Sequence, residues 1–172
     1  KYGDKPFLLE KVTTEFEPTT YSETREIALT TGAGLAALGI EPKQAVSILA
    51  EGCNAWITSE LGLLYAGAIS VPLSIKLEES NDLLFRLRHA DVVAIFVSKY
   101  QLPKIRRIKE QLPLLKHIIV YDEVEFEQNE MSLEALKQLG AKHLAEHEEA
   151  FLAIGRAIEH HAYATITYTS GT

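Results

Sequence analysis

The pattern of apolar and polar residues along the chain predicts strands and helices in regular alternation. Two extended stretches open it, Phe7 to Val12 and Glu15 to Thr19, and both are rich in residues that favour β-structure. Thr13 and Thr14 lie between them and leave room only for a tight turn. We therefore expect a short N-terminal β-hairpin.

The first helix has recognisable start and stop signals. Thr20 followed by Glu23 matches a capping box, in which the threonine hydroxyl and the glutamate carboxylate bond exposed amides of the first turn. Gly39 and Pro42 end the pattern, because glycine readily closes a helix and proline cannot continue one. The helix is therefore expected to run to about Leu38.

Beyond this helix, short apolar strands alternate with amphipathic helices. The expected strands cover residues 45–50, 69–73, 93–97, 117–121 and 164–169, and the helices cover about 54–68, 81–90, 102–112 and 131–160. In the helix at 54–68, one stripe is expected to face the core: Ile57, Leu61, Leu64, Tyr65 and Ala68. Strands that are continuous apolar runs are typical of parallel sheets covered on both faces. The fold class is therefore α/β, a doubly wound, mostly parallel sheet with helices on both faces, preceded by the hairpin.

No feature of the pattern divides the chain. Residues 122–132 are acidic and polar and are expected to form a surface loop, and no internal repeat or low-complexity linker interrupts the rest. At 172 residues, the chain has the size of one domain. We expect residues 1–172 to form a single α/β domain.

Composition and charge narrow the classes of function. The net charge is −7 and acidic residues are scattered along the chain, so no basic face is expected to bind nucleic acid. Hydrophobic residues make up 47% of the chain, but no segment reaches the apolar length of a transmembrane helix. The single cysteine, Cys53, excludes an internal disulfide and is typical of a reducing compartment, so we expect a cytoplasmic location.

The stretch "TGAGLAA" at residues 31–37 matches the glycine pattern of dinucleotide-binding folds, and Glu51 lies near the usual distance of a ribose-binding carboxylate. The context does not fit that function. Gly39 and Pro42 leave no room for the crossover helix whose N-terminus would face a pyrophosphate. We expect these glycines to serve packing within a helix instead.

The stretch "HLAEH", His143 to His147, matches the H-x-x-E-H pattern of zinc peptidases, in which two histidines hold the metal and the glutamate acts as a base. Charged residues surround it, and a catalytic site would also need a third protein ligand and a closed cleft. We expect an exposed amphipathic helix here rather than a metal site. His160 and His161 are likewise expected to form a polar helix end.

The stretch "YTSGT", Tyr168 to Thr172, differs because its position supports its chemistry. An apolar strand leads into it, and loops at the carboxyl ends of parallel strands build ligand sites. Glycine lets backbone amides approach an anion closely, and serine and threonine hydroxyls add small donors. An ordinary polar turn has a similar composition, and the G-x-x-x-x-G-K-[ST] pattern of a P-loop is not met. The candidates for phosphate binding are Thr169, Ser170, Gly171 and Thr172.

"YTSGT" resembles the start of the signature loop of AMP-forming acyl-CoA synthetases, members of the adenylate-forming superfamily, in which the loop continues T-G-x-P-K-G. Other parts of the chain are similar to the opening helices and strands of that family. They are residues 20–49, 56–73 with Trp56, Gly67 and Pro72 in register, 81–98 and 164–172. The long helical segment at 131–162 and the stretch at 112–123 are most similar to the long-chain fatty acid branch.

The resemblance implies an ATP-dependent, AMP-forming acid–thiol ligase that uses Mg2+. A fatty acid carboxylate would attack the α-phosphate of ATP, releasing pyrophosphate and giving an acyl-adenylate, and the thiol of coenzyme A would then displace AMP. Such chemistry depends on positioning and on neutralising charge. Carried over to this chain, Thr169, Ser170, Gly171 and Thr172 would grip the β- and γ-phosphates, and no catalytic base and no metal ligand is implied among them.

The resemblance also implies that the chain is the N-terminal part of a larger enzyme, truncated inside its phosphate-binding loop. The adenine pocket, the Mg-binding acid, the acyl tunnel and a mobile lysine would all follow Thr172. The chain alone is therefore expected to be inactive and to bind ATP very weakly or not at all. Oligomeric state stays open, and so does peripheral membrane association, because acyl substrates partition into lipid.

The competing interpretation is a self-standing, non-catalytic module that resembles a flavodoxin or a receiver domain. A receiver needs acidic residues clustered at strand ends, and Glu51 and Asp122 are too few to indicate one. A bound flavin would colour the protein, which a spectrum would detect. Within the superfamily, peptide-synthetase adenylation and luciferase-like chemistry stay open, because the acyl-selecting residues lie outside the sequence.

Overall fold

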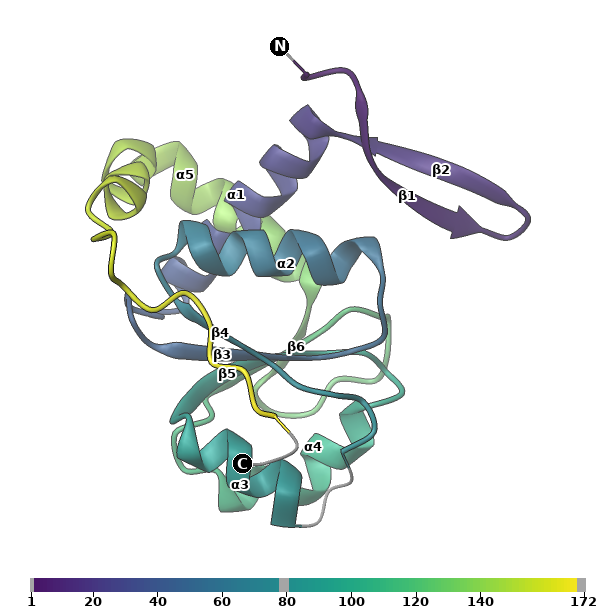
Figure 1. Ribbon diagram of the computed structural model, residues 1–172, viewed down its shortest axis with the longest axis vertical. Coiled ribbons are helices and arrows are strands. Elements are labelled where there is room, and N and C mark those ends of the chain that lie inside the picture. The colour runs from purple at the N-terminus through teal and green to yellow at the C-terminus, as the bar shows by residue number, and fades with distance from the viewer. Residues whose placement is uncertain (1, 78–80, 170–172) are drawn as a thin grey trace.

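The computed structural model describes residues 2–77 and 81–169, and its centre is a parallel sheet between two layers of helices (Figure 1). The strands are β1 (Pro6–Val12), β2 (Glu15–Thr20), β3 (Ala45–Leu49), β4 (Ile69–Pro72), β5 (Val92–Val97), β6 (His117–Val120) and β7 (Glu130–Ser132). The helices are α1 (Tyr21–Ala37), α2 (Asn54–Tyr65), α3 (Asn81–His89), α4 (Leu102–Ile108), the 3-10 turn η1 (Lys109–Gln111) and α5 (Leu133–Arg156).

The predicted hairpin and the predicted start of α1 are confirmed. β1 and β2 pair antiparallel, and Thr13 between them takes a positive φ of 59°. The backbone amide of Thr20 donates to the carboxylate of Glu23 at 2.7 Å, and the Thr20 hydroxyl accepts from the Glu23 amide at 3.2 Å. These bonds occupy donors that the start of a helix otherwise leaves unpaired.

The main sheet has the strand order β4-β3-β5-β6-β7, and every neighbouring pair is parallel. The expected α/β, doubly wound class is therefore confirmed. The chain goes from β3 to β4 on one side of β3, and it then crosses to β5 on the other side. In doubly wound folds, ligands bind beyond the carboxyl ends of the strands near such a change of direction.

The two edges of the sheet differ from the expectation. Residues 130–132, expected within a loop, form the edge strand β7, which is too short and too polar for periodicity to reveal. Residues 164–169, expected as a strand, make only one bridge, Thr165 opposite Ser70, with backbone hydrogen bonds of 2.9 and 2.8 Å. The next bond of that ladder would need an amide hydrogen on Pro72, which proline lacks.

Each face of the sheet carries its own apolar core. Val46 and Ile48 of β3 pack in the core beneath α1, α2 and α5, whereas Ala45 and Leu49 pack in the core beneath α3 and α4. Figure 1 shows these two helical layers on opposite sides of the strands. Because successive side chains of a strand point to opposite faces, one continuous apolar run supplies both cores.

The apolar stripe predicted on α2 is wrong at Ile57 and Leu64, whereas Tyr65 packs against the core and Ala68, just beyond the helix, is buried. Ile57 and Leu64 are each 37% exposed, and the buried positions of the helix are instead Thr58, Ser59, Gly62 and Leu63. The small side of α2 lies against α1, where Gly62 meets Thr31. Since α2 carries apolar residues on both sides, periodicity alone could not choose the side that packs.

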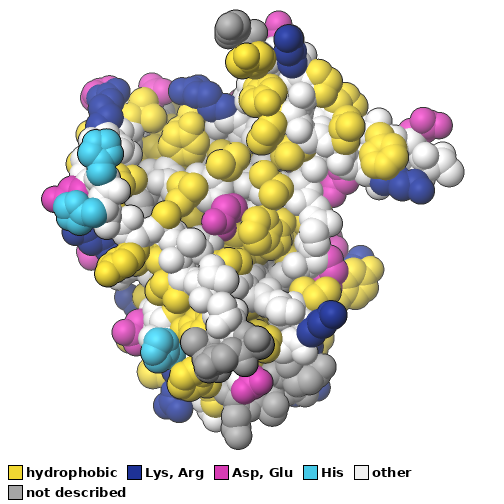
Figure 2. Space-filling view, viewed as in Figure 1, with side chains coloured by type: hydrophobic (Ala, Val, Ile, Leu, Met, Phe, Trp, Pro, Cys, Tyr) yellow, Lys and Arg dark blue, Asp and Glu magenta, His cyan; other side chains and the backbone are white. Residues whose placement is uncertain are grey.

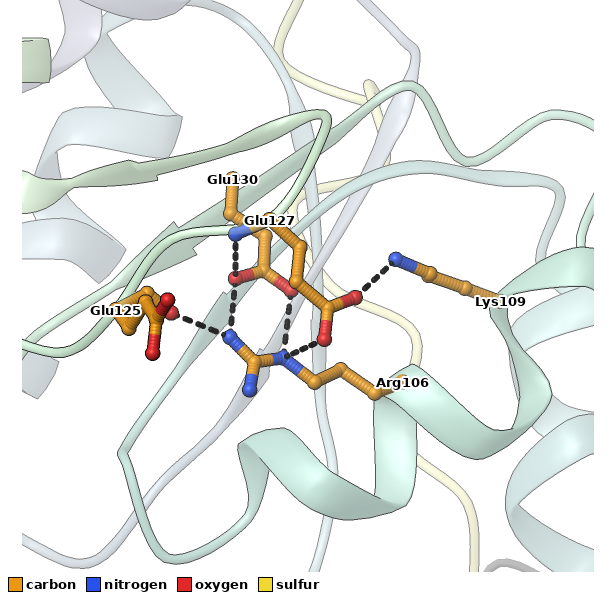
Figure 3. A network of polar contacts seen from close by, with 5 residues as sticks. All are labelled: Arg106, Lys109, Glu125, Glu127 and Glu130. Atoms are coloured by element: carbon orange, nitrogen blue, oxygen red, sulfur yellow. Dashed lines mark hydrogen bonds and ion pairs between the residues drawn. The ribbon is translucent and has the colours of Figure 1, made fainter.

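A charged network holds α4 to the segment that leads into β7 (Figure 3). Arg106 donates to the carboxylate of Glu130 at 2.9 and 2.7 Å and to the carbonyl oxygen of Glu125 at 2.8 Å. The carboxylate of Glu127 forms ion pairs with both cations: it lies 3.3 Å from Nε of Arg106 and 2.8 Å from Nζ of Lys109. Burial of Glu130 raises the pKa of its carboxyl group. The hydrogen bonds that it accepts from Arg106 and from the backbone amide of Glu127 lower the pKa by more, so the pKa of Glu130 lies below its usual range.

Candidate functional site

The predicted phosphate-binding stretch begins at the carboxyl edge of the sheet. Thr165 pairs parallel with Ser70, so residues 164–169 run in the direction of the five strands and lead Thr169 to the edge where those strands end. Thr169 is exposed there. Ser170, Gly171 and Thr172 lie outside the described residues, so the rest of the loop stays a prediction.

The side chain of Tyr168, directly before Thr169, is bound to α3. Its hydroxyl lies 2.8 Å from Nδ1 of His89 and donates to the carbonyl oxygen of Arg86 at 3.2 Å. Burial raises the pKa of the Tyr168 hydroxyl, with the Arg86 charge acting in the opposite direction. Local sequence does not indicate His89 and Arg86 as partners of Tyr168, because they lie 79 and 82 positions away from it and only the fold brings them together.

Polar side chains that follow β3 and β5 lie in contact at the carboxyl ends of these two strands, where the strand order reverses. Nε2 of Gln101 donates to Glu51 at 2.7 Å. Burial works against ionisation of Glu51, but the nearby Ser98 and Gln101 outweigh it and hold the pKa of Glu51 below its usual range. Asp122, after β6, has a different partner, the ammonium group of Lys99 at 3.5 Å. Glu51 and Asp122 are therefore engaged with separate residues.

The glycines of the stretch at 31–37 lie inside α1 and serve packing, as expected. A Cβ on Gly32 would collide with the backbone of Gly62 in α2, and a Cβ on Gly34 would collide with Leu136 of α5. From the other side, Gly140 of α5 lies against the carbonyl oxygen of Thr30. The glycines let three helices approach closely, and the stretch does not form the strand, turn and helix of a dinucleotide site.

The histidines of the "HLAEH" stretch lie on the outer part of α5. The ring centroids of His143 and His147 are 4.9 Å apart, and the backbone leaves helical geometry at His147, which kinks the helix. Within residues 2–77 and 81–169, no three or more His, Cys, Asp or Glu side chains are grouped to hold a metal ion. The expected helix end at 160 is wrong, since α5 stops at Arg156 and His160 and His161 are exposed beyond it.

The whole chain, residues 1–172, matches the family of AMP-binding enzymes. The chain therefore belongs to the AMP-binding enzyme family, as the resemblance of "YTSGT" indicated. This match supports the ligase interpretation over a self-standing flavodoxin-like or receiver-like module.

Curated relatives of the chain are long-chain fatty acid–CoA ligases. The long-chain-fatty-acid–CoA ligase ACSBG1 of Macaca fascicularis is 30% identical over 175 residues, which cover 100% of this chain and 24% of that protein. The Homo sapiens protein of the same name is also 30% identical with the same coverage. The long chain acyl-CoA synthetase 2 of Arabidopsis thaliana is 27% identical and is covered over 27% of its length. The chain thus spans about a quarter of the length of these relatives.

Solved structures support the fold assignment. The anthranilate CoA ligase AuaEII, in complex with anthranoyl-AMP, superposes with a TM-score of 0.72 at 25% identity, covering 80% of this chain and 25% of that one. The coronafacic acid ligase of Pectobacterium brasiliense gives a TM-score of 0.66 at 22% identity, covering 71% and 25%. The second likeness is one of fold alone.

Proposed function

We propose that residues 1–172 are the N-terminal α/β domain of a longer long-chain fatty acid–CoA ligase. The observation that carries the proposal is the family match over the whole chain. The curated relatives add the substrate class, since they are named long-chain fatty acid–CoA ligases and match along the entire chain.

In such an enzyme, ATP supplies the adenylyl group that activates a fatty acid, and coenzyme A receives the acyl group as a thioester. The role of this chain in the reaction is to bind the β- and γ-phosphates of ATP. The donors are the hydroxyls and backbone amides of Thr169, Ser170, Gly171 and Thr172. These donors are small and carry no charge of their own, so their contribution is positioning and not proton transfer. The exposed place of Thr169 at the carboxyl edge of a parallel sheet suits this role.

The proposal includes Mg2+, which accompanies the phosphates of ATP, and its protein ligand belongs to the part of the enzyme beyond this chain. The described residues, 2–77 and 81–169, contain no helix that is both long enough and apolar enough to span a bilayer. We infer a cytoplasmic location, supported by the single cysteine, with peripheral contact to membranes supported by the lipid character of the acyl substrate.

Acid-dependent pyrophosphate exchange by the full-length polypeptide tests this function. With ATP, Mg2+ and a series of fatty acids, we expect labelled pyrophosphate to enter ATP only when a long-chain fatty acid is present, followed by thioester formation once coenzyme A is added. Anthranilate and benzoate serve as competing substrates, since the solved structures similar to this chain include an anthranilate CoA ligase and, at a TM-score of 0.61 and 24% identity, a benzoate CoA ligase from Burkholderia xenovorans. If anthranilate or benzoate supports exchange and none of the fatty acids does, the proposed substrate class is wrong, although the ligase reaction still holds.

The isolated 172-residue chain should bind Mg-ATP very weakly or not at all. It carries four of the residues expected to hold the phosphates, Thr169 to Thr172, and the resemblance implies that the other parts of the ATP site belong to the rest of the enzyme. Titration calorimetry measures this directly, with the full-length polypeptide as the positive control. A micromolar dissociation constant for the isolated chain would show that the phosphate site is complete without the rest of the enzyme.

A further inference from the structure

The stretch between α5 and the candidate phosphate loop has little regular structure. After Arg156, the chain passes through residues 157–163, most of them exposed, and meets the sheet at Thr165. The bridge to Ser70 therefore fixes the chain four residues before Thr169. A phosphate loop works best when its donors are already in position, so attachments nearer to Thr169 matter for binding.

Tyr168 makes such an attachment one residue before Thr169. Its hydroxyl lies within hydrogen-bonding distance of Nδ1 of His89, at 2.8 Å, and of the carbonyl oxygen of Arg86, at 3.2 Å. A phenol has a single proton to donate, and a carbonyl can only accept. The proton of Tyr168 therefore goes to Arg86, and Nδ1 of His89 carries the proton that the tyrosine oxygen accepts.

The ring of Tyr168 is held as well as its hydroxyl. The guanidinium carbon of Arg86 lies 5.5 Å from the ring centroid, and the His89 ring meets it edge on, with the planes at 73°. Arg86 and His89 are three residues apart on α3 and so lie on one side of the helix. Leu83 and Leu87 fix α3 in the core against which Tyr168 also packs.

We propose that Tyr168 and His89 are positioning residues, whose hydrogen bond anchors the start of the phosphate-binding loop to α3 and orders it for the phosphates of ATP. The proposal rests on the proposed function of residues 169–172. Residues 169–172 are all small, so none of them offers a large side chain to pack into the core. Tyr168, directly before them, supplies a large, partly buried side chain that does.

Kinetics of the full-length polypeptide test the anchor. Tyr168→Phe keeps the ring and removes the hydroxyl, and the matched control Tyr163→Phe removes a hydroxyl from a side chain in the same stretch that is 82% exposed. For Tyr168→Phe, we expect the KM for ATP in pyrophosphate exchange to rise about fivefold, the effect of one hydrogen bond of average strength. Thioester formation from supplied acyl-adenylate should be unchanged, and Tyr163→Phe should behave as the wild type in both steps.

Two substitutions of His89 separate a hydrogen bond from simple packing. His89→Asn retains an N–H donor close to the place of Nδ1, and we expect it to keep most of the wild-type KM for ATP. His89→Leu fills space without a donor and should match Tyr168→Phe. Equal KM values for His89→Asn and His89→Leu would overturn the hydrogen bond as the cause.

Amide hydrogen exchange of the nucleotide-free protein gives a result that does not depend on activity. Residues 162–169 should exchange faster in Tyr168→Phe than in Tyr163→Phe. Equal exchange overturns the anchor, and faster exchange with an unchanged KM for ATP overturns its positioning role. If the wild-type protein catalyses no pyrophosphate exchange with any acid, the proposed function and the positioning role fail together, while hydrogen exchange still decides whether the anchor exists.

Discussion

Gly140 lies where two helices touch backbone to backbone. A Cβ on this residue of α5 would collide with the carbonyl oxygen of Thr30 and come within 2.7 Å of the amide nitrogen of Gly34, both in α1. Backbone atoms cannot rotate away as the end of a side chain can, so the helices would have to separate. We expect Gly140→Ala to lower the free energy of unfolding by about 1–3 kcal/mol, measured by urea denaturation of the chain.

The control for this substitution is Gly155→Ala, near the end of the same helix. A Cβ there meets nothing within 4 Å, so only the helical preference of alanine changes. That preference should stabilise the chain by about 0.5–1 kcal/mol. If both variants were destabilised by a similar amount, the close approach of α1 and α5 would not be the cause of the effect of Gly140→Ala.

At the scale of elements, the Arg106 network decides how firmly α4 holds the segment before β7. The side chain of Glu130 is fully buried beside that of Arg106, which is 29% exposed, so this ion pair is shielded from water. Glu130→Gln keeps the shape and removes the charge. We expect it to lower the free energy of unfolding at pH 7 by about 2 kcal/mol, the range for hydrogen bonds to charged groups.

The pH dependence of the Glu130 effect follows from its lowered pKa. A carboxyl whose pKa in the folded chain lies below its ordinary value of 4.5 contributes fully above pH 4.5 and loses its contribution as the pH falls through the folded value. The difference between wild type and Glu130→Gln should therefore shrink below pH 4.5 in urea unfolding. Glu134→Gln, which breaks an ion pair of a carboxylate that is 58% exposed, should change stability by less than about 0.5 kcal/mol.

These elements also show what local sequence can and cannot predict. The capping box at Thr20 and the apolar run of β5 act through neighbours in the chain, and both were predicted correctly. The packed side of α2, the strand β7 and the bond between Tyr168 and His89 depend on distant partners, and none was predicted. In the candidate site, Thr169 to Thr172 stay a prediction from local composition, whereas the contact of Tyr168 with His89 comes from the fold alone.

The whole molecule exposes apolar side chains on its hairpin and on α2. Figure 2 shows hydrophobic side chains gathered over these elements. The most exposed are Phe16 at 63%, Leu9 at 61%, Phe7 at 41%, and Ile57 and Leu64 at 37% each. A hollow of about 390 Å³ lies between the hairpin, α1 and α2, lined by residues that include Phe7, Leu61 and Tyr65. Contiguous apolar surface of this kind promotes association.

The isolated chain should therefore associate as its concentration rises. Ile57→Glu combined with Leu64→Glu places charge within the apolar surface of α2, and we expect it to shift the chain towards monomer. Sedimentation velocity over a concentration series measures the effect. The control, Gln128→Glu with Gln138→Glu, adds the same charge at exposed polar positions and should leave association nearly unchanged. If both pairs of substitutions reduce association equally, net charge and not the apolar surface of α2 governs it.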